Sequence, residues 1–309
     1  MKPLARHLDN YLNLRRQLGY KLRGIDNLLR HFVRFAEQKR APFITTKLAV
    51  TWATYPTHLP LKQKAHRLGV VRRFAQHLSA LDPRTEIPAQ RLLPYHCARR
   101  DPYRYRAGDI LRLMQATREI DPNCHLKGAS YATLIGLLAV TGMRVGEAVA
   151  LDRQDVDLTR GVVTVRHAKG DKLRLVPLHR SSQQALRHYA ALRDEAFPQP
   201  VGSGFFVSER GTRLCYSTVH QWFRKVVRQI GLLQAGDRHE PRLHDLRHHF
   251  AIETLVRWYR SKANVEAHLP ELSTYLGHAH VRDTYWYLEA APELLRLATQ
   301  RCVRKEAKR

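Results

Sequence analysis

The sequence predicts a mainly α-helical protein with a small β component: an N-terminal helical bundle followed by a larger α+β domain. Three observations predict this fold class. Apolar residues recur every three or four positions through most of the chain, as they do in helices that bury one face. Residues 162–166 and 173–178 instead have the composition of strands, and the short polar turn between them predicts a hairpin. The length of 309 residues exceeds that of one ordinary domain.

The N-terminal domain is expected over residues 1–82 as a small bundle of four helices. The apolar spacing predicts helices over 3–18, 26–38 and 61–81, and a shorter third helix that Thr45 or Thr46 caps and that ends near Thr54. Basic side chains fill outward positions of the fourth helix: Lys62, Lys64, Arg67, Arg72 and Arg73. Solvated charge explains many of these residues one by one, whereas their number favours contacts with phosphate groups.

The chain as a whole is strongly basic. Its formal net charge is +26 and its pI about 10.5, which predicts a polyanionic partner. Residues 1–99 carry 19 basic and 5 acidic side chains, against 34 and 22 in the remainder. The first third therefore holds more than half of the excess charge, and we expect it to clamp nucleic acid. A generically basic protein is the alternative.

Residues 83–106 are expected to link the two domains, because they contain four prolines and show no convincing periodicity. The second domain then extends over residues 107–291. It is followed by a basic tail, 292–309, which could close on its own domain or dock on a neighbouring subunit.

The second domain should surround one buried helix. Residues 129–141 are apolar nearly all round, so no face of a helix there would be suited to water. Further helices are expected near 108–117, 181–195 and 216–230, with a short apolar strand at 205–207. The strands 162–166 and 173–178 should form a hairpin with lysines at its tip.

Neither metal nor nucleotide chemistry is indicated. The four cysteines are far apart, so the sequence favours neither a disulfide framework nor a zinc site, and a reducing compartment fits. There is no phosphate-cradling Gly-Lys-Ser/Thr loop and no acidic cluster, so no metal or ATP is expected. No run of residues has the apolar length of a membrane span. We therefore expect a soluble, cytoplasmic, nucleoid-associated protein of prokaryotic type.

Residues 242–289 carry the side chains of a candidate active site. His244 and Arg247 are three positions apart and share one face of a predicted helix. Gly277 is expected to end a short helix and leave His278 free to point into a cleft, and Tyr287 follows. An arginine, two histidines and a tyrosine suit an anionic substrate such as phosphate, with the tyrosine as nucleophile.

Arg144 is a second arginine of interest, because it follows the buried helix within a glycine-containing turn. A buried arginine is costly unless it is paired. From this position alone, a salt bridge with Glu147 and a phosphate ligand are equally good interpretations.

Taken in order, these segments resemble the tyrosine recombinase (phage-integrase type) family. The matching pieces are Thr-Gly-Met-Arg144-Val-Gly-Glu147, Lys169 in the hairpin turn, His244-Asp-Leu-Arg247-His, Leu-Gly-His278, and Tyr287 nine residues later. The resemblance covers residues from about 107 to 290, and the N-terminal bundle resembles the core-binding, SAM-like domain that precedes it in that family. It implies the catalytic set Arg144, Lys169, His244, Arg247, His278 and Tyr287.

Two of these positions have competitors. Tyr285 lies two residues before Tyr287, and the spacing from His278 favours Tyr287. Lys172 competes with Lys169, which the Lys-Gly-Asp-Lys order places at the family position. Three further histidines are best explained by packing or phosphate contacts: His248, His249 and His280.

The resemblance implies a site-specific DNA recombinase that cuts and rejoins DNA through a 3′-phosphotyrosine intermediate and a Holliday junction, without metal or ATP. Its implied partners are double-stranded recombination sites bound by a homo-tetramer, with an accessory DNA-bending or directionality protein as an option. Integration, excision or transposition of a mobile element would be its role. The alternatives are a type IB topoisomerase, which shares this chemistry, and a catalytically silent DNA-binding regulator.

Overall fold

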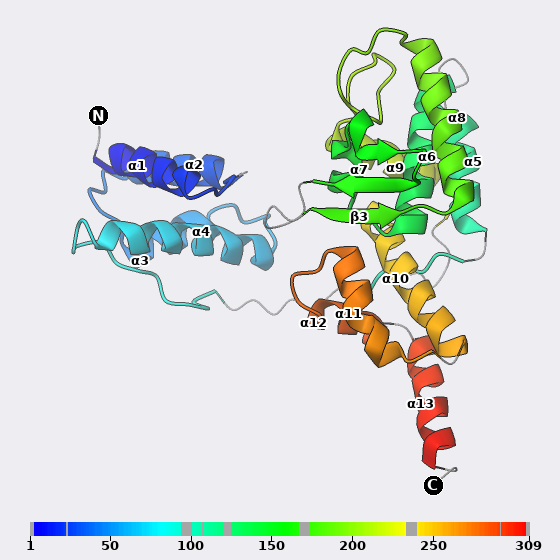
Figure 1. The fold of residues 1–309 in the computed structure, drawn as a ribbon. Helices are drawn as coiled ribbons and strands as arrows, with labels where there is room; N and C mark the ends of the chain where they lie inside the picture. Colours follow the sequence, from blue (N-terminus) through cyan, green and yellow to red (C-terminus); the bar gives the residue numbers. More distant parts are fainter. Residues whose placement is uncertain are drawn as a thin grey trace. The chain divides into compact units, whose positions relative to one another are not determined.

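The computed structural model describes residues 3–22, 24–93, 101–106, 108–119, 125–166, 173–232, 240–261, 263–290 and 292–306. The chain forms two compact units, residues 1–100 and 101–309 (Figure 1). The boundary between them falls inside the segment 83–106, whose composition predicts a linker. The predicted fold class, mainly helical with a small sheet, is confirmed.

The first unit is a helical bundle, as predicted. Its described helices are α1 (Pro3–Gln17), α2 (Ile25–Gln38), α3 (Thr46–Thr54) and α4 (Leu61–Ser79). Their apolar faces meet in one core, in which Phe32, Trp52 and Phe74 are almost fully buried. Thr45 caps α3, because its side chain accepts a hydrogen bond from the backbone N–H of Leu48.

Part of the segment predicted as a linker packs onto this bundle. The backbone N–H of Glu86 donates to the carbonyl of Ile44 at 2.8 Å, and the Glu86 carboxylate accepts from the backbone N–H of Thr46 at 2.7 Å. Leu93 packs against the bundle core. The prolines of this segment remove helical periodicity but leave its other backbone groups able to pair, so the sequence pattern gave no sign of the docking.

Residues 101–106 belong to the second unit. Tyr103 and Tyr105 are buried in its core, and their rings meet edge to face at 5.1 Å. The Tyr103 hydroxyl donates to the carbonyl of Leu232 at 2.9 Å. The Tyr105 hydroxyl donates to the carbonyl of Arg242 at 3.3 Å, so this segment is tied to the residue that precedes the candidate site helix.

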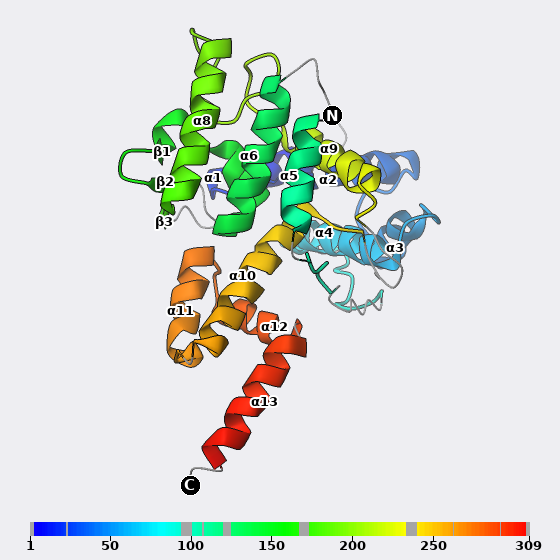
Figure 2. The same cartoon turned by 90° about the vertical axis from the view of Figure 1, so that its right-hand side faces the viewer.

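The first part of the second unit surrounds the buried helix α6 (His125–Thr141). Figure 2 shows α6 between α5 (Asp109–Glu119) and α8 (Arg180–Ala196). The short α7 (Val145–Ala150) follows α6, and α9 (Tyr216–Gln229) packs nearby through Trp222, whose ring stacks on Tyr131 at 4.2 Å. The apolar composition of residues 129–141 is thereby explained, since neighbours cover α6 on several sides.

The sheet of this unit is small and antiparallel, with strand order β1-β2-β3. The predicted hairpin is present as β2 (Val162–Val165) and β3 (Arg174–Pro177). The strand β1 (Val156–Asp157), which follows a 3-10 turn at Arg153–Asp155, was not predicted, because two residues are too short to show alternation.

The prediction of a strand at residues 205–207 was wrong. Gly204 and Val207 form only isolated bridges, with Asp152 and Arg213 respectively. The apolar run instead supplies the buried rings of Phe205 and Phe206 to the core.

The last part of the second unit holds the C-terminal helices, α10 (Leu243–Arg260), α11 (Val265–Leu276), α12 (Arg282–Ala290) and α13 (Pro292–Glu306). They share an apolar cluster that includes Leu255, Leu272, Tyr287 and Leu294. The residues predicted as a basic tail therefore form a helix that packs against α10 of the same chain. An ion pair also joins these two helices, with 2.6 Å between Arg260 Nη2 and Glu293 Oε1. Within the described ranges, no helix combines the length and the apolar character needed to cross a membrane.

Candidate active site

Two tight glycine turns shape the candidate site. Gly142 follows α6 with a φ of 61°, and Gly277 ends α11 with a φ of 69°. A Cβ at Gly142 would lie 2.5 Å from Cδ1 of Phe250, and one at Gly277 would lie 2.5 Å from Nη1 of Arg174. Both positions therefore favour glycine for backbone conformation, and at Gly142 the Phe250 ring also leaves no space for a Cβ. Each turn also leaves carbonyl groups at a helix C-terminus without an intrahelical partner.

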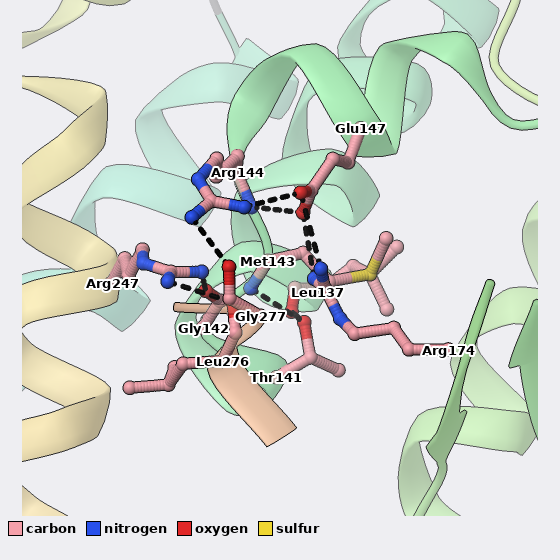
Figure 3. Close-up of polar contacts among 10 residues, drawn as sticks. All are labelled: Leu137, Thr141, Gly142, Met143, Arg144, Glu147, Arg174, Arg247, Leu276 and Gly277. Carbon is pink, nitrogen blue, oxygen red and sulfur yellow. Dashed lines mark hydrogen bonds and ion pairs between the residues drawn. The ribbon is translucent and has the colours of Figure 1, made fainter. Parts of the chain in front are cut away.

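Arg247 connects these two turns from α10 (Figure 3). Its Nη1 donates to the carbonyl of Gly142 at 2.8 Å, and its Nη2 donates to the carbonyl of Leu276 at 2.7 Å. The residue is only 2% exposed. Burial lowers the pKa of Arg247 to about 10, while Tyr287 opposes that shift. The guanidinium therefore stays charged at neutral pH and holds three segments together.

Arg144 lies beside Arg247 at the start of α7. Its Nη1 donates to Oε1 of Glu147 and its Nη2 donates to the carbonyl of Gly277, both at 2.8 Å. The side chain is 33% exposed, and three of the five guanidinium N–H groups have no partner among the described residues. The salt bridge with Glu147 is therefore present, and donors remain for a ligand as well.

Glu147 is shared by two arginines. Arg174 of β3 donates from Nη1 to Oε1 of Glu147 at 3.1 Å and from Nη2 to Oε2 at 2.6 Å. The backbone N–H of Arg144 donates to Oε2 at 3.0 Å. Burial alone would raise the pKa of Glu147, but hydrogen bonds and charge from Arg174 and Arg144 hold it below its usual range. Glu147 is therefore a carboxylate.

Arg174 was missed by the sequence analysis, although a signal existed. Val176 is a core residue of β3, and strand side chains alternate between faces. Arg174, two positions earlier, therefore shares the inward face, where its side chain is 10% exposed. Leu173 and Leu175 are each 59% exposed. An arginine on the core-facing register, flanked by outward leucines, indicates a buried charge partner.

His244 lies one turn before Arg247 on α10. The surrounding chain desolvates its imidazole and, together with the charge of Arg247, lowers the pKa of His244 to about 4. Because the residue is also exposed on its outer side, water screens part of this effect. Because the pKa of His244 is lowered, its imidazole is neutral at pH 7 and has a nitrogen able to accept a proton.

Tyr287 is enclosed by aromatic rings. The ring centroids of His248 and His278 lie 5.5 and 6.0 Å from the ring centroid of Tyr287. The His278 ring is close to parallel to the Tyr287 ring. Thr284 orients His278, since the histidine Nδ1 lies 2.8 Å from Thr284 Oγ1. Tyr287 is 2% exposed, whereas Tyr285 is 49% exposed on the same helix. Tyr287 is thus the tyrosine that shares its surroundings with the candidate histidines.

The remaining predicted residues are placed as follows. His248 contacts His244, with ring centroids 4.6 Å apart, and His249 packs against Tyr105 at 5.8 Å. Lys169 and its competitor Lys172 lie outside the described residues. Five of the six predicted residues are therefore described, and they come from the N-cap of α7, from α10 and α12, and from the turn after α11. No group of metal-binding side chains is found among the residues with described positions.

Comparison with known proteins shows the family to which the chain belongs. The phage integrase family matches residues 104–293. The “Putative integrase/recombinase y4rB” of Sinorhizobium fredii is 44% identical over 99% of this chain and 98% of its own length. The tyrosine recombinase XerC of Azotobacter vinelandii is 32% identical over 72% of this chain and 68% of its own length.

Two solved structures show the same fold at lower identity. The Tn1549 transposon integrase in complex with transposon right end DNA covers 97% of this chain and 99% of its own, with a TM-score of 0.68 and 16% identity. A lambda integrase tetramer bound to a Holliday junction covers 92% of this chain and 76% of its own, with a TM-score of 0.58 and 19% identity. By its sequence and its fold, this chain belongs to the phage integrase family of tyrosine recombinases.

Proposed function

We propose that the chain is a site-specific DNA recombinase that forms a 3′-phosphotyrosine link through Tyr287. One observation carries the proposal: two arginines with different exposure converge on the turn before His278, beside the ring cluster that holds Tyr287. Such a set suits a phosphodiester, whose nonbridging oxygens gain charge as the phosphorus is attacked. Guanidinium groups offer planar pairs of donors to those oxygens and do not lose their protons.

The proposed step breaks one bond and forms another. The Tyr287 oxygen attacks the phosphorus, the bond to the 5′ oxygen breaks, and the phosphate remains joined to the tyrosine at the 3′ end. His244, neutral at pH 7, would accept the tyrosine proton, and the nearby phosphate would strengthen it as a base. Lys169 would give a proton to the leaving 5′ oxygen, and His278 would donate a hydrogen bond to a phosphate oxygen. The bond energy is retained in the link, so religation needs no ATP, and no metal takes part.

Tyr287 must become accessible for this reaction. Its side chain is 2% exposed, and the apolar cluster that it joins also contains Leu294 of α13. We therefore expect α12 to move when DNA binds, so that the hydroxyl reaches the phosphate.

DNA sites are the proposed partners. The net charge of +26 supports binding to a polyanion. Exchange between two sites, each bound by two protomers, implies a tetramer on DNA. The proposed role is integration, excision or transposition of a mobile element, with an accessory bending or directionality protein as an optional partner.

Covalent trapping tests the proposal. The protein would be incubated without metal with DNA from the ends of its own genetic element, nicked near the suspected cleavage position. We expect a covalent adduct on denaturing gels that Tyr287→Phe abolishes. Tyr285→Phe is the matched control, two residues away and exposed, and should keep the adduct. Tight binding of the native chain to the same DNA without any adduct would favour a silent DNA-binding regulator.

A further inference from the structure

Arg174 is in an unusual position for a charged side chain. It lies on the inward face of a short strand and is nine-tenths buried, in contact with the two residues that hold Arg144. Both of its terminal nitrogens donate to Glu147, and its Nη1 lies where a Cβ at Gly277 would be only 2.5 Å away. Arg144 contacts the same glutamate and donates to the carbonyl of the same glycine. The two arginines therefore share Glu147 as a partner (Figure 3), and both lie near Gly277.

The hydrogen bonds of Glu147 are fully divided between these arginines. Oε1 accepts from the side chains of Arg144 and Arg174, and Oε2 accepts from Arg174 and from the backbone of Arg144. Each carboxylate oxygen thus accepts two hydrogen bonds, which is its ordinary capacity. As a result the Arg144 side chain donates to Glu147 from one nitrogen only. It cannot form the bidentate pair that an arginine and a carboxylate otherwise prefer.

Fold stability alone does not explain this arginine. Nε of Arg174 is buried and has no hydrogen-bond partner within the described part of the chain. A buried unpaired donor destabilises a protein. An apolar side chain at this position would avoid that cost. Val176, two positions later on the same face of β3, shows that the core accepts apolar side chains there.

We propose that Arg174 is a positioning residue for DNA cleavage. By donating to one acceptor position on each Glu147 oxygen, it prevents Arg144 from closing onto the carboxylate and leaves Arg144 donors directed to the scissile phosphate. Arg174 also brings a net positive charge to the cluster, since two arginines face one glutamate. Its ion pair with Glu147 also joins β3, which follows Lys169 in the sequence, to α7. This inference rests on the proposed function.

The proposal predicts a defect in rate and not in affinity. Arg174→Gln should slow single-turnover adduct formation at saturating DNA by about 10- to 100-fold, because misplacing one reacting group by about 1 Å has effects of that size. The dissociation constant for DNA should change less than three-fold. Arg174→Lys, which keeps the charge but cannot make the paired contact, should be slowed as well.

Arg193 supplies a matched control. It is also a buried arginine that makes paired contacts with a carboxylate, Asp194, and donates to the carbonyl of Phe205. Among the described residues it shares no partner with the candidate site. Arg193→Gln should lower the melting temperature and leave the rate per folded molecule unchanged. If Arg174→Gln is too unstable to assay, Arg174→Lys carries the comparison.

A double-mutant cycle with Glu147→Gln separates positioning from a general structural role. If Arg174 acts through Glu147, adding Arg174→Gln to Glu147→Gln should slow the reaction by less than three-fold. Additive losses, or native rates in both Arg174 variants while the native chain forms its adduct, would overturn the inference. Absence of an adduct from the native chain would instead overturn the proposed function.

Discussion

Two arginines, Arg144 and Arg247, meet at the C-terminal ends of two helices, and this placement explains why they are stable there. The carbonyls of Gly142, Leu276 and Gly277 follow α6 or end α11, where intrahelical partners run out and the helix dipole is negative. Arg144 and Arg247 satisfy those carbonyls. Their charges are thus held by backbone groups that need donors, while exposed N–H groups of Arg144 remain for a substrate.

The depressed pKa of His244 predicts how pH affects stability. The unfolded chain has an ordinary histidine that binds a proton near pH 6.5, whereas the folded chain binds it only near pH 4. Between these values the unfolded state holds more protons, so unfolding becomes easier as pH falls. The contribution of His244 to stability is therefore complete above about pH 6.5 and is lost as pH falls toward 4. The lowered pKa of His249 acts in the same direction.

Urea unfolding between pH 4 and pH 7 would check this prediction. The native chain should lose stability toward the acid end, and His244→Gln should lose less over the same interval, because glutamine does not titrate. An equal slope for the two proteins would show that His244 is not desolvated in the folded state.

At the scale of elements, the glycine turns decide where the helices of the site stop. Gly142→Ala should destabilise the fold, because the backbone there is left-handed and the added carbon would lie 2.5 Å from Phe250. The expected loss is about 1–3 kcal/mol of unfolding free energy, from backbone strain and overpacking.

Gly146 offers the control for that substitution. It lies inside α7, and nothing stands within 4 Å of an added Cβ. Gly146→Ala should therefore raise stability slightly, by up to about 1 kcal/mol, through helix propensity. Denaturant unfolding of both variants gives the comparison, and equal effects would mean that Gly142 has room that the structure does not show.

The helices and other segments also differ in how well they could be predicted from the sequence. The predicted bounds of α1, α2, α6 and α9 agree with the observed ones to within a few residues, because each helix buries one face, or in α6 nearly its whole surface, and this burial determines the apolar pattern. The docking of residues 83–93 was not anticipated. For residues 292–309 a helix was not predicted, although packing on their own domain was one of the two stated options. The docked segment is fixed by specific contacts such as those of Glu86, and α13 is fixed by the burial of Leu294 in a cluster formed with other helices.

At the scale of the whole molecule, the net charge predicts how strongly DNA binding depends on salt concentration. If many of the 53 lysines and arginines contact phosphates, each contact releases counterions. DNA affinity should then fall by about three decades or more between 50 and 200 mM salt. Filter binding or fluorescence anisotropy over that range would measure it. A flat profile would refute the expectation that the basic N-terminal unit clamps DNA.

Arg73→Gln narrows that test to the first unit. The residue is exposed on α4, so its loss should leave the fold unchanged. If it contacts a phosphate, the salt slope should decrease by about one, with similar weakening on every DNA sequence.

By itself the sequence determined the helical class, the basic character and the order of the family motifs, because periodicity, charge and spacing are local properties of the chain. The tertiary structure alone decided that Glu147 serves two arginines, that Arg174 joins the site, and that Tyr287 rather than Tyr285 is enclosed with the histidines. These outcomes depend on contacts between α7, β3, α10 and α12, which lie up to about 140 residues apart along the chain. Local spacing carries no record of such contacts, whereas folding must pair each buried charge with a partner wherever the chain can supply one.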